Sequence, residues 1–145
     1  MAQDLDIEHV ARALQVSIGL LRRRLRQAPV EGELTLPEIS ALSRLDRGGP
    51  TTSAALARAE QISPQSMGAT LGGLEARGLV ERRPDPEDGR RAVMSVTDAG
   101  LRAMRVRRDA RTEQLAQALS AGFSRSELKQ LMAAAPLIER LAESL

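Results

Sequence analysis

Small and polar side chains gather on one face of a helix-sized stretch near the middle of the chain. Ser63 is a favoured helix N-cap residue, and Pro64 suits the first helical position, where its missing N–H costs nothing. Met67, Leu71 and Leu74 then recur at helical spacing and predict a buried stripe. The outward face would carry an amide, two hydroxyls and otherwise only small groups: Gln65, Ser66, Ala69, Thr70, Gly72, Gly73 and Ala76. An amide and hydroxyls on so small a face could approach nucleobase edges closely and hydrogen-bond to them.

A charged hairpin follows this helix. Two segments rich in Leu, Val and Met, Leu79–Arg83 and Ala92–Val96, flank a tip of Pro, Gly and charged residues. The tip carries Arg90 and Arg91 behind a turn at Asp88. Its acidic residues lack the acceptor pattern of a Ca²⁺ loop, which favours a tip braced by Asp–Arg pairing. Arginine can contact phosphates and guanine edges through two N–H groups at once, so the hairpin is a candidate nucleic-acid contact.

A shorter helix precedes both features. Gly48, Gly49 and Pro50 break the chain, Thr52 then has the preference of a helix N-cap, and Leu56 would anchor the helix in the core. Two short helices followed by a basic hairpin form a winged helix-turn-helix pattern. That pattern suits a DNA duplex, with the second helix in the major groove and the hairpin reaching the neighbouring minor groove.

The run from Leu56 to Gly100 resembles the core of the MarR (multiple antibiotic resistance regulator) family of bacterial transcription factors. The similar elements are Leu56-Ala57, Ser63, Leu74-Glu75, Gly78-Leu79-Val80, Arg82, Asp85-Pro86, Asp88, Arg90, Thr97 and Gly100. The resemblance implies a DNA-binding regulator of transcription. The resemblance and the residue patterns described above together predict the DNA-contact residues: Thr52, Ser53, Ser63, Pro64, Gln65, Ser66, Ala69, Thr70, Gly73, Asp88, Arg90 and Arg91.

Apolar stripes also mark both ends of the chain. They predict an amphipathic helix over about 5–28 and a last helix with a capping box at Ser124 and Glu127, which Pro136 should kink or split. The central lobe offers these stripes little surface, so we expect them to pack on a second copy, as the resemblance also implies. A monomer whose ends fold back on the lobe is the alternative. The predicted dimer contacts are Ile7, Val10, Leu14, Ile18, Leu128, Leu131, Ile138 and Leu141.

The expected fold is therefore mainly α-helical with a small β-hairpin wing. We expect one domain over 1–145, in which 34–111 forms the winged helix-turn-helix lobe and begins a long connecting helix. Segments 5–30 and 112–145 supply the dimerisation helices. That long helix should begin after the cap residue Thr97 and end at Ala121-Gly122.

Composition narrows the chemistry further. The formal net charge is +2, yet residues 77–111 hold ten arginines against six acidic residues. The chain has no cysteine, one histidine (His9) and one aromatic residue (Phe123), so we expect no metal, no cofactor and no base stacking. No long apolar run or secretory pattern is present, and we expect a cytoplasmic protein without a membrane span. No catalytic set of side chains is apparent, so an enzyme is not expected.

Some features leave the function open. Arg22, Arg23, Arg24 and Arg26 could complement a helix dipole, or they could contact DNA or an acidic ligand. The recognition helix lacks the long polar side chains that many relatives carry there, so base reading would depend on few groups: Gln65 and the hydroxyls of Ser66 and Thr70. Readout of DNA shape through the wing would then carry more of the recognition. We expect a homodimeric repressor that binds an inverted-repeat operator and is released by a small-molecule effector, to which no residues can be assigned. A winged-helix protein-interaction module that has lost DNA reading is the alternative.

Overall fold

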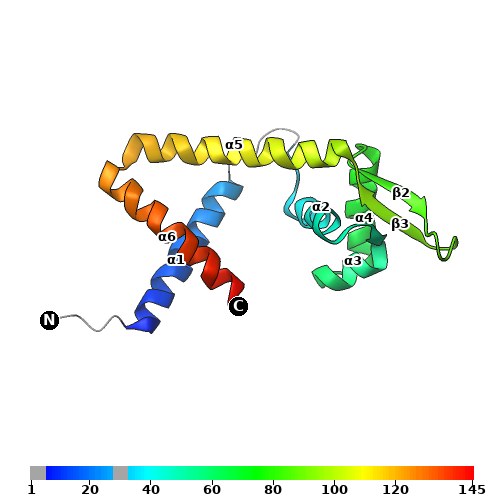
Figure 1. Ribbon diagram of the computed structural model, residues 1–145, viewed down its shortest axis with the longest axis horizontal. Coiled ribbons are helices and arrows are strands. Elements are labelled where there is room, and N and C mark those ends of the chain that lie inside the picture. Colours follow the sequence, from blue (N-terminus) through cyan, green and yellow to red (C-terminus); the bar gives the residue numbers. More distant parts are fainter. Residues whose placement is uncertain (1–5, 28–32) are drawn as a thin grey trace.

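The structure, a computed structural model, describes residues 6–27 and 33–145, so the outer ends of the predicted 5–30 segment lie outside the described residues. Its elements are α1 (Ile7–Arg26), α2 (Leu36–Gly48), β1 (Thr51–Thr52), α3 (Ser53–Glu60), α4 (Pro64–Ala76), β2 (Val80–Pro84), β3 (Ala92–Val96), α5 (Asp98–Gly122) and α6 (Arg125–Glu143). A lobe of α2–α4 and the sheet lies at one end, and α5 leads away from it (Figure 1). The mainly α-helical winged fold is as the sequence predicts.

Side-chain caps fix where the helices begin. The Thr35 hydroxyl accepts from the Glu38 N–H while Glu38 Oε2 accepts from the Thr35 N–H at 2.8 Å, a reciprocal capping box at α2. Ser124 and Glu127 repeat the arrangement at α6. Thr52 caps α3, accepting from the Ala55 N–H at 3.2 Å. The starts of α3 and α6 agree with the sequence predictions because a cap depends only on neighbouring residues.

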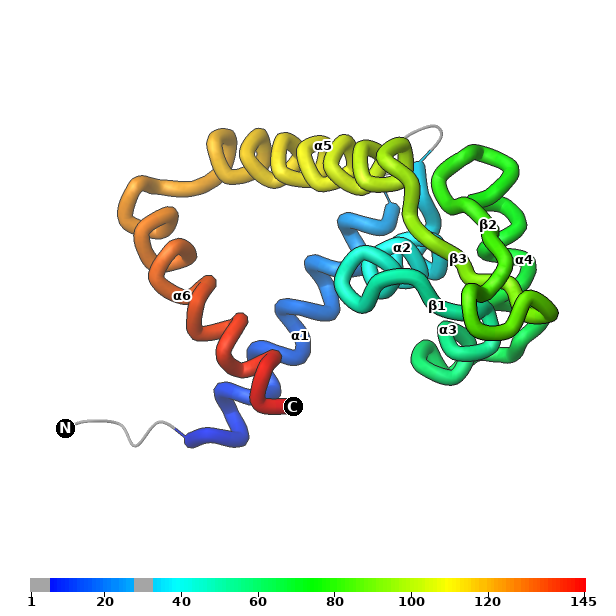
Figure 2. Tube along the Cα trace, turned by 45° about the vertical axis from the view of Figure 1, so that its right-hand side comes forward, coloured from blue at the N-terminus to red at the C-terminus, as the bar shows by residue number. Residues whose placement is uncertain are grey.

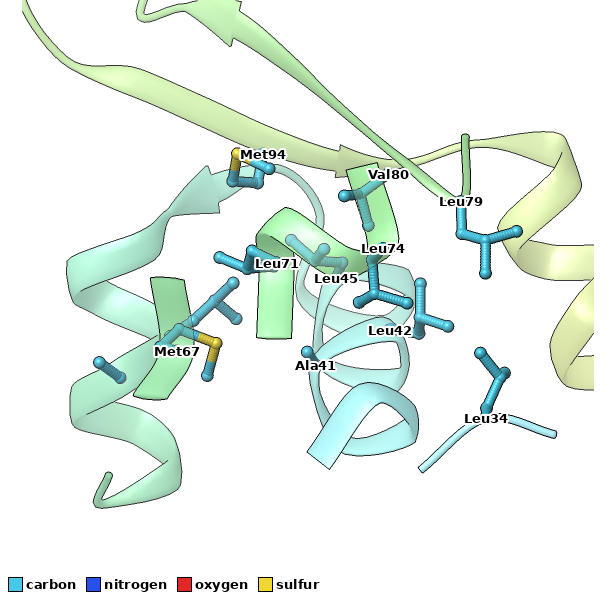
Figure 3. Close-up of a cluster of buried hydrophobic side chains, with 12 residues drawn as sticks. Leu34, Ala41, Leu42, Leu45, Met67, Leu71, Leu74, Leu79, Val80 and Met94 are labelled. Atoms are coloured by element: carbon cyan, nitrogen blue, oxygen red, sulfur yellow. The ribbon is translucent and has the colours of Figure 1, made fainter. Parts of the chain in front are cut away.

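One hydrophobic core holds the lobe together. Figure 3 shows α2, α3 and α4 directing apolar side chains toward the sheet. The stripe expected on α4 is buried, since Met67, Leu71 and Leu74 are each almost fully covered. The other buried residues are Leu34, Ala41, Leu42, Leu45, Leu56, Ala57, Leu79, Val80 and Met94. Because this core lies directly beneath α4, the small face of that helix points to solvent.

The sheet has three antiparallel strands in the order β1-β3-β2. Strand β3 pairs with β2 in the wing, aligning Val80 with Val96, and with β1, aligning Thr51 with Met94. The sequence predicts the wing hairpin, with its first strand displaced by one residue, but not β1. A strand of two residues has no hydrophobic period, so only pairing with β3 reveals it.

The first turn of α5 packs tightly on the lobe. Gly78 follows α4 with a left-handed backbone, φ +72°, which glycine adopts without steric cost. The Thr97 hydroxyl donates to the Gly78 carbonyl at 2.6 Å, and the Thr97 N–H donates to the Leu79 carbonyl at 3.1 Å. Gly100 is buried, and a Cβ on it would lie 2.2 Å from the Leu79 carbonyl oxygen. Only glycine therefore permits this approach of α5 to the start of β2.

The helices outside the lobe have no such core. Neither α1 nor α6 contains a buried residue. Figure 2 shows α6 folding back from the far end of α5, on the side where α1 lies. Pro136 does not split α6, which is a single helix from Arg125 to Glu143. A proline removes only one intrahelical hydrogen bond, and the rest of the helix is retained on both sides.

Gly100→Ala should destabilise the lobe by about 1–3 kcal/mol, because the new methyl group clashes with backbone that cannot yield freely. Gly68→Ala is the matched control: nothing lies within 4 Å of a Cβ built at Gly68, which is inside α4. That change should raise stability by up to about 1 kcal/mol. Urea denaturation followed by circular dichroism measures both, and equal stabilities for the two variants would contradict the close approach.

Candidate nucleic-acid interface

The exposed face of α4 has the composition that the sequence predicts. Ser66, Ala69 and Gly73 are exposed, as is Gln65 in the first turn. The Gln65 amide makes no hydrogen bond within the described part of the chain. Both its donor and its acceptor are thus free toward solvent, which is the state that a base-reading amide needs.

The hydroxyls beside Gln65 are partly committed to the helix itself. Ser63 Oγ accepts from the Ser66 N–H at 3.1 Å and donates to Ser66 Oγ at 2.9 Å. The half-buried Thr70 donates its hydroxyl to the Ser66 carbonyl at 3.0 Å. Thr70 can then only accept from a ligand, whereas Ser66 retains its own proton to donate. Pro64 is exposed at the first helical position and has no N–H to offer.

Two predicted contact residues at the start of α3 are less exposed than most of those on α4. Thr52 is half-buried, pairs through its backbone in β1, and uses its hydroxyl as the α3 cap. Ser53 is half-buried as the first residue of α3. Helices α3 and α4 pack on each other in the lobe, so the two N-terminal turns are held by one core.

Aspartate side chains of the wing pair with the arginines of the same hairpin. Asp88 Oδ1 accepts from the Arg90 N–H at 3.1 Å and lies 3.4 Å from Arg90 Nε. Arg91 Nε lies 3.7 Å from Asp85 Oδ2, and its carbonyl accepts from the Asp85 N–H at 2.9 Å. The predicted Asp–Arg bracing is therefore present, and Asp88 serves the wing rather than facing outward as a free group. The Arg90 side chain is 94% exposed, so phosphate could reach its guanidinium.

Ion pairs that the sequence analysis did not identify fix the far end of α4. Glu75, near that end, pairs with Arg82 on the wing strand at 3.4 Å. Arg77 lies 3.6 Å from Glu38, the capping residue of α2. The partners of each pair are brought together by a turn or by the packing of the core. Their separations in the sequence do not match the spacing of an ion pair within one helix, so the sequence did not predict them. They tie the candidate recognition helix to the wing and to α2.

The described residues show neither the pattern of a metal site nor that of a helical membrane span. Residues 6–27 and 33–145 hold no group of three His, Cys, Asp or Glu side chains that could bind a metal ion. None of the helices in these ranges is both long and apolar enough to cross a membrane.

Comparison with solved structures finds the same architecture over almost the whole chain. A transcriptional regulator from Pseudomonas aeruginosa aligns with a TM-score of 0.75 at 34% identity, covering 98% of this chain and 97% of that one. The PcaV transcriptional regulator from Streptomyces coelicolor, solved with its natural ligand, aligns with a TM-score of 0.54 at 26% identity over 99% and 96%.

Sequence relatives agree with the structural likeness. A helix-turn-helix-type transcriptional regulator of Mycobacterium bovis, itself uncharacterised, is 36% identical over 134 residues, 92% of this chain and 93% of the relative. The MarR family model matches residues 33–91, which span α2, both helices of the helix-turn-helix, the first wing strand β2 and the wing tip. The chain belongs to the MarR family and is a helix-turn-helix regulator of transcription.

Proposed function

We propose that this regulator is a homodimer that reads an inverted-repeat operator in double-stranded DNA and represses transcription until a small-molecule effector releases it. One observation carries the proposal: a small, exposed helix face with an uncommitted amide lies on the same rigid lobe as a wing whose arginine is almost fully exposed. In this arrangement α4 enters the major groove and the wing meets the adjacent backbone or minor groove.

Helix α4 and the wing would contribute differently to DNA binding. Gln65 lies in the N-terminal turn of α4, the part of a recognition helix that contacts base edges, and its amide matches the donor and acceptor of adenine. Ala69 and Gly73 add no polar groups and let the helix approach closely. Most affinity would then come from phosphate contacts by the wing, and part of the specificity from the shape of the groove that Arg90 enters.

Dimerisation accounts for the apolar surface outside the lobe. Ile7 is 83% exposed, and Leu131, Ile138 and Leu141 are each at least 40% exposed. Soluble proteins seldom leave such a patch open, and each leucine or isoleucine that becomes fully buried contributes about 1.5–3 kcal/mol. A second copy that offers the same helices covers them by two-fold symmetry. The apolar faces of α1 and α6 also contain half-buried residues that would lie in the same dimer interface: Val10, Leu14, Ile18 and Leu128.

Repression in this scheme works by occupancy. A dimer that covers two half-sites within a promoter excludes polymerase from the same DNA. We place the dimerisation segments at 5–30 and 112–145 and the DNA-binding lobe at 34–111, in a cytoplasmic protein that acts directly on the chromosome.

A hollow between α1 and the start of the lobe suits the effector. Its volume is about 320 Å³, and its lining combines two leucines with four arginines: Arg22, Leu25, Arg26, Leu36, Arg107 and Arg111. The buried Arg107 Nε lies 3.4 Å from Glu33 Oε1 but makes no hydrogen bond among the described residues. A ligand with a carboxylate and an aliphatic body fits these groups, whereas the lining has no aromatic ring on which to stack a flat ligand. PcaV, the relative solved with its natural ligand, lends support by analogy.

A protein-interaction module remains the alternative function. Three glycines, Gly68, Gly72 and Gly73, lie in α4 and cost about 2–3 kcal/mol of helix propensity relative to alanine. They also remove the side chains with which a recognition helix usually reads bases. The exposed Arg90 argues for DNA instead, since a protein partner would not require a cationic wing.

Fluorescence anisotropy with a DNA duplex from the region upstream of the protein's own gene discriminates between the two functions. A regulator should bind that duplex far more tightly than a shuffled duplex of the same composition. The ratio of affinities should be about 10³ or more, as is typical of specific protein–DNA complexes. Equal affinity for the two duplexes, or no binding to either, would favour the interaction module.

Gln65→Ala should cost about 1–3 kcal/mol on the specific operator, concentrated at one base pair in each half-site. Binding to shuffled DNA should hardly change, because phosphate contacts supply nearly all non-specific affinity. The same anisotropy titrations measure both quantities. An unchanged operator affinity would mean that the face of α4 is only a spacer and that the protein reads DNA shape.

Arg90→Ala should weaken binding to every duplex and flatten its salt dependence, by about one unit of slope for each phosphate that the variant no longer neutralises. Arg125→Ala is the control, because that exposed arginine lies at the start of α6, outside the lobe. Titrations at several salt concentrations give the slopes. Identical slopes for wild type and Arg90→Ala would remove the wing from the interface.

Leu141→Glu should convert the dimer to a monomer or an aggregate, since it places an unpaired charge within the buried contact. Lys129→Glu is the control on the opposite face of α6, away from Leu131, Ile138 and Leu141, and should remain dimeric. Sedimentation velocity reads out both variants. A dimeric Leu141→Glu variant, or a monomeric wild type, would contradict the assignment of α6 to the dimer interface.

A further inference from the structure

Helix α1 is attached to the rest of its subunit at few points. It makes no extensive contact with any other element of the subunit, and none of its residues is buried. Among the described residues, a hydrogen bond near the C-terminal end of α1 joins this helix to α5.

Arg111, in the middle of α5, makes this bond and others at the same time. Its Nη1 donates to the Leu25 carbonyl, one of the last carbonyls of α1, and to Gln114 Oε1 at 3.0 Å. Its Nη2 donates to Glu33 Oε1 at 2.6 Å, just before the start of α2. Arg107, one turn earlier, places Nε 3.4 Å from the same Glu33 oxygen. One guanidinium thus joins α1, α5 and the entry to the lobe.

The surroundings of this cluster make its bonds strong. The side chains of Glu33 and Arg111 are 13% and 16% exposed, so water screens their attraction little. The short contact to Glu33 is a charge-assisted hydrogen bond, stronger than one between neutral groups. The bond to Leu25 satisfies a helix C-terminal carbonyl and places positive charge at the negative end of the α1 dipole.

We propose that Arg111 is a positioning residue that fixes the orientation of α1 relative to the DNA-binding lobe, with Glu33 as the anchor on the lobe side. Because α1 belongs to the dimer interface in the proposed function, this clamp would also set the separation of the two lobes. The regulator would then select the spacing between half-sites through a residue of α5 that lies outside the recognition helix and the wing. The selection of spacing rests on the proposed function, whereas the orientation of α1 does not.

The clamp can be tested on the DNA-free protein with two spin labels. The chain has no cysteine, so the exposed positions Gln15 on α1 and Ala54 on α3 can be replaced by cysteine and labelled uniquely. Mixing the labelled protein with an excess of unlabelled protein ensures that the measured distance lies within one subunit. Pulsed electron–electron resonance then reports the distribution of distances between α1 and the lobe.

The wild-type background should give one narrow distance peak, and Arg111→Met should lose it in favour of a broad or divided distribution. Arg111→Lys should recover part of the peak, because an ammonium can still reach Glu33 but cannot hold Leu25 at the same time. Arg105→Met is the matched control: Arg105 is an exposed arginine of α5 with no ion pair in the described part of the chain, so its peak should stay narrow. Circular dichroism should show equal helix content in all variants.

Three outcomes would overturn the clamp: a narrow peak in Arg111→Met, a broad distribution in the wild type, or equal broadening in Arg105→Met. Operators whose half-sites are moved apart by one base pair provide the second readout. Wild type should discriminate against the altered spacing and Arg111→Met should do so less. Absence of any operator binding would contradict the proposed function, while the label distances would still decide the clamp.

Discussion

The close contact between the first turn of α5 and the start of β2 sets the geometry of the whole chain. Thr97 bonds to the carbonyls of Gly78 and Leu79, and Gly100 leaves no Cβ in the space between the two backbones. At this one junction α4 ends, the wing begins and the long helix leaves the lobe. A change in that contact would alter the direction of α5 relative to α4, and every element beyond α5 would move with it.

The features predicted from the sequence are those encoded locally. The cap residue Thr97, the buried stripe of α4 and the capping box at Ser124 each depend on residues a few positions apart, and all are present. Strand β1 and the ion pair between Glu33 and Arg111 could not be predicted in this way. The partners of that ion pair are 78 residues apart, and only the folded core and α5 bring them together. The DNA contacts and dimer contacts remain predictions.

Two kinds of surface coexist on this regulator. The lobe is a closed core that presents a small polar helix face and a wing braced by its own carboxylates. The helices outside the lobe have exposed apolar faces that are complete only against another surface. Among the described residues, α5 packs closely on the lobe at its first turn, whereas α1 makes few contacts. In the proposed function, the effector binds beside Arg107 and Arg111, where these two parts meet.

The central claim is that two lobes of one dimer read one DNA duplex, and hydroxyl-radical footprinting on the upstream operator tests it most directly. The account predicts an inverted repeat protected as two symmetric segments about one helical turn apart, roughly 10 base pairs. Titration to the end point should consume two chains for each duplex. Protection of a single half-site by one chain would contradict the account.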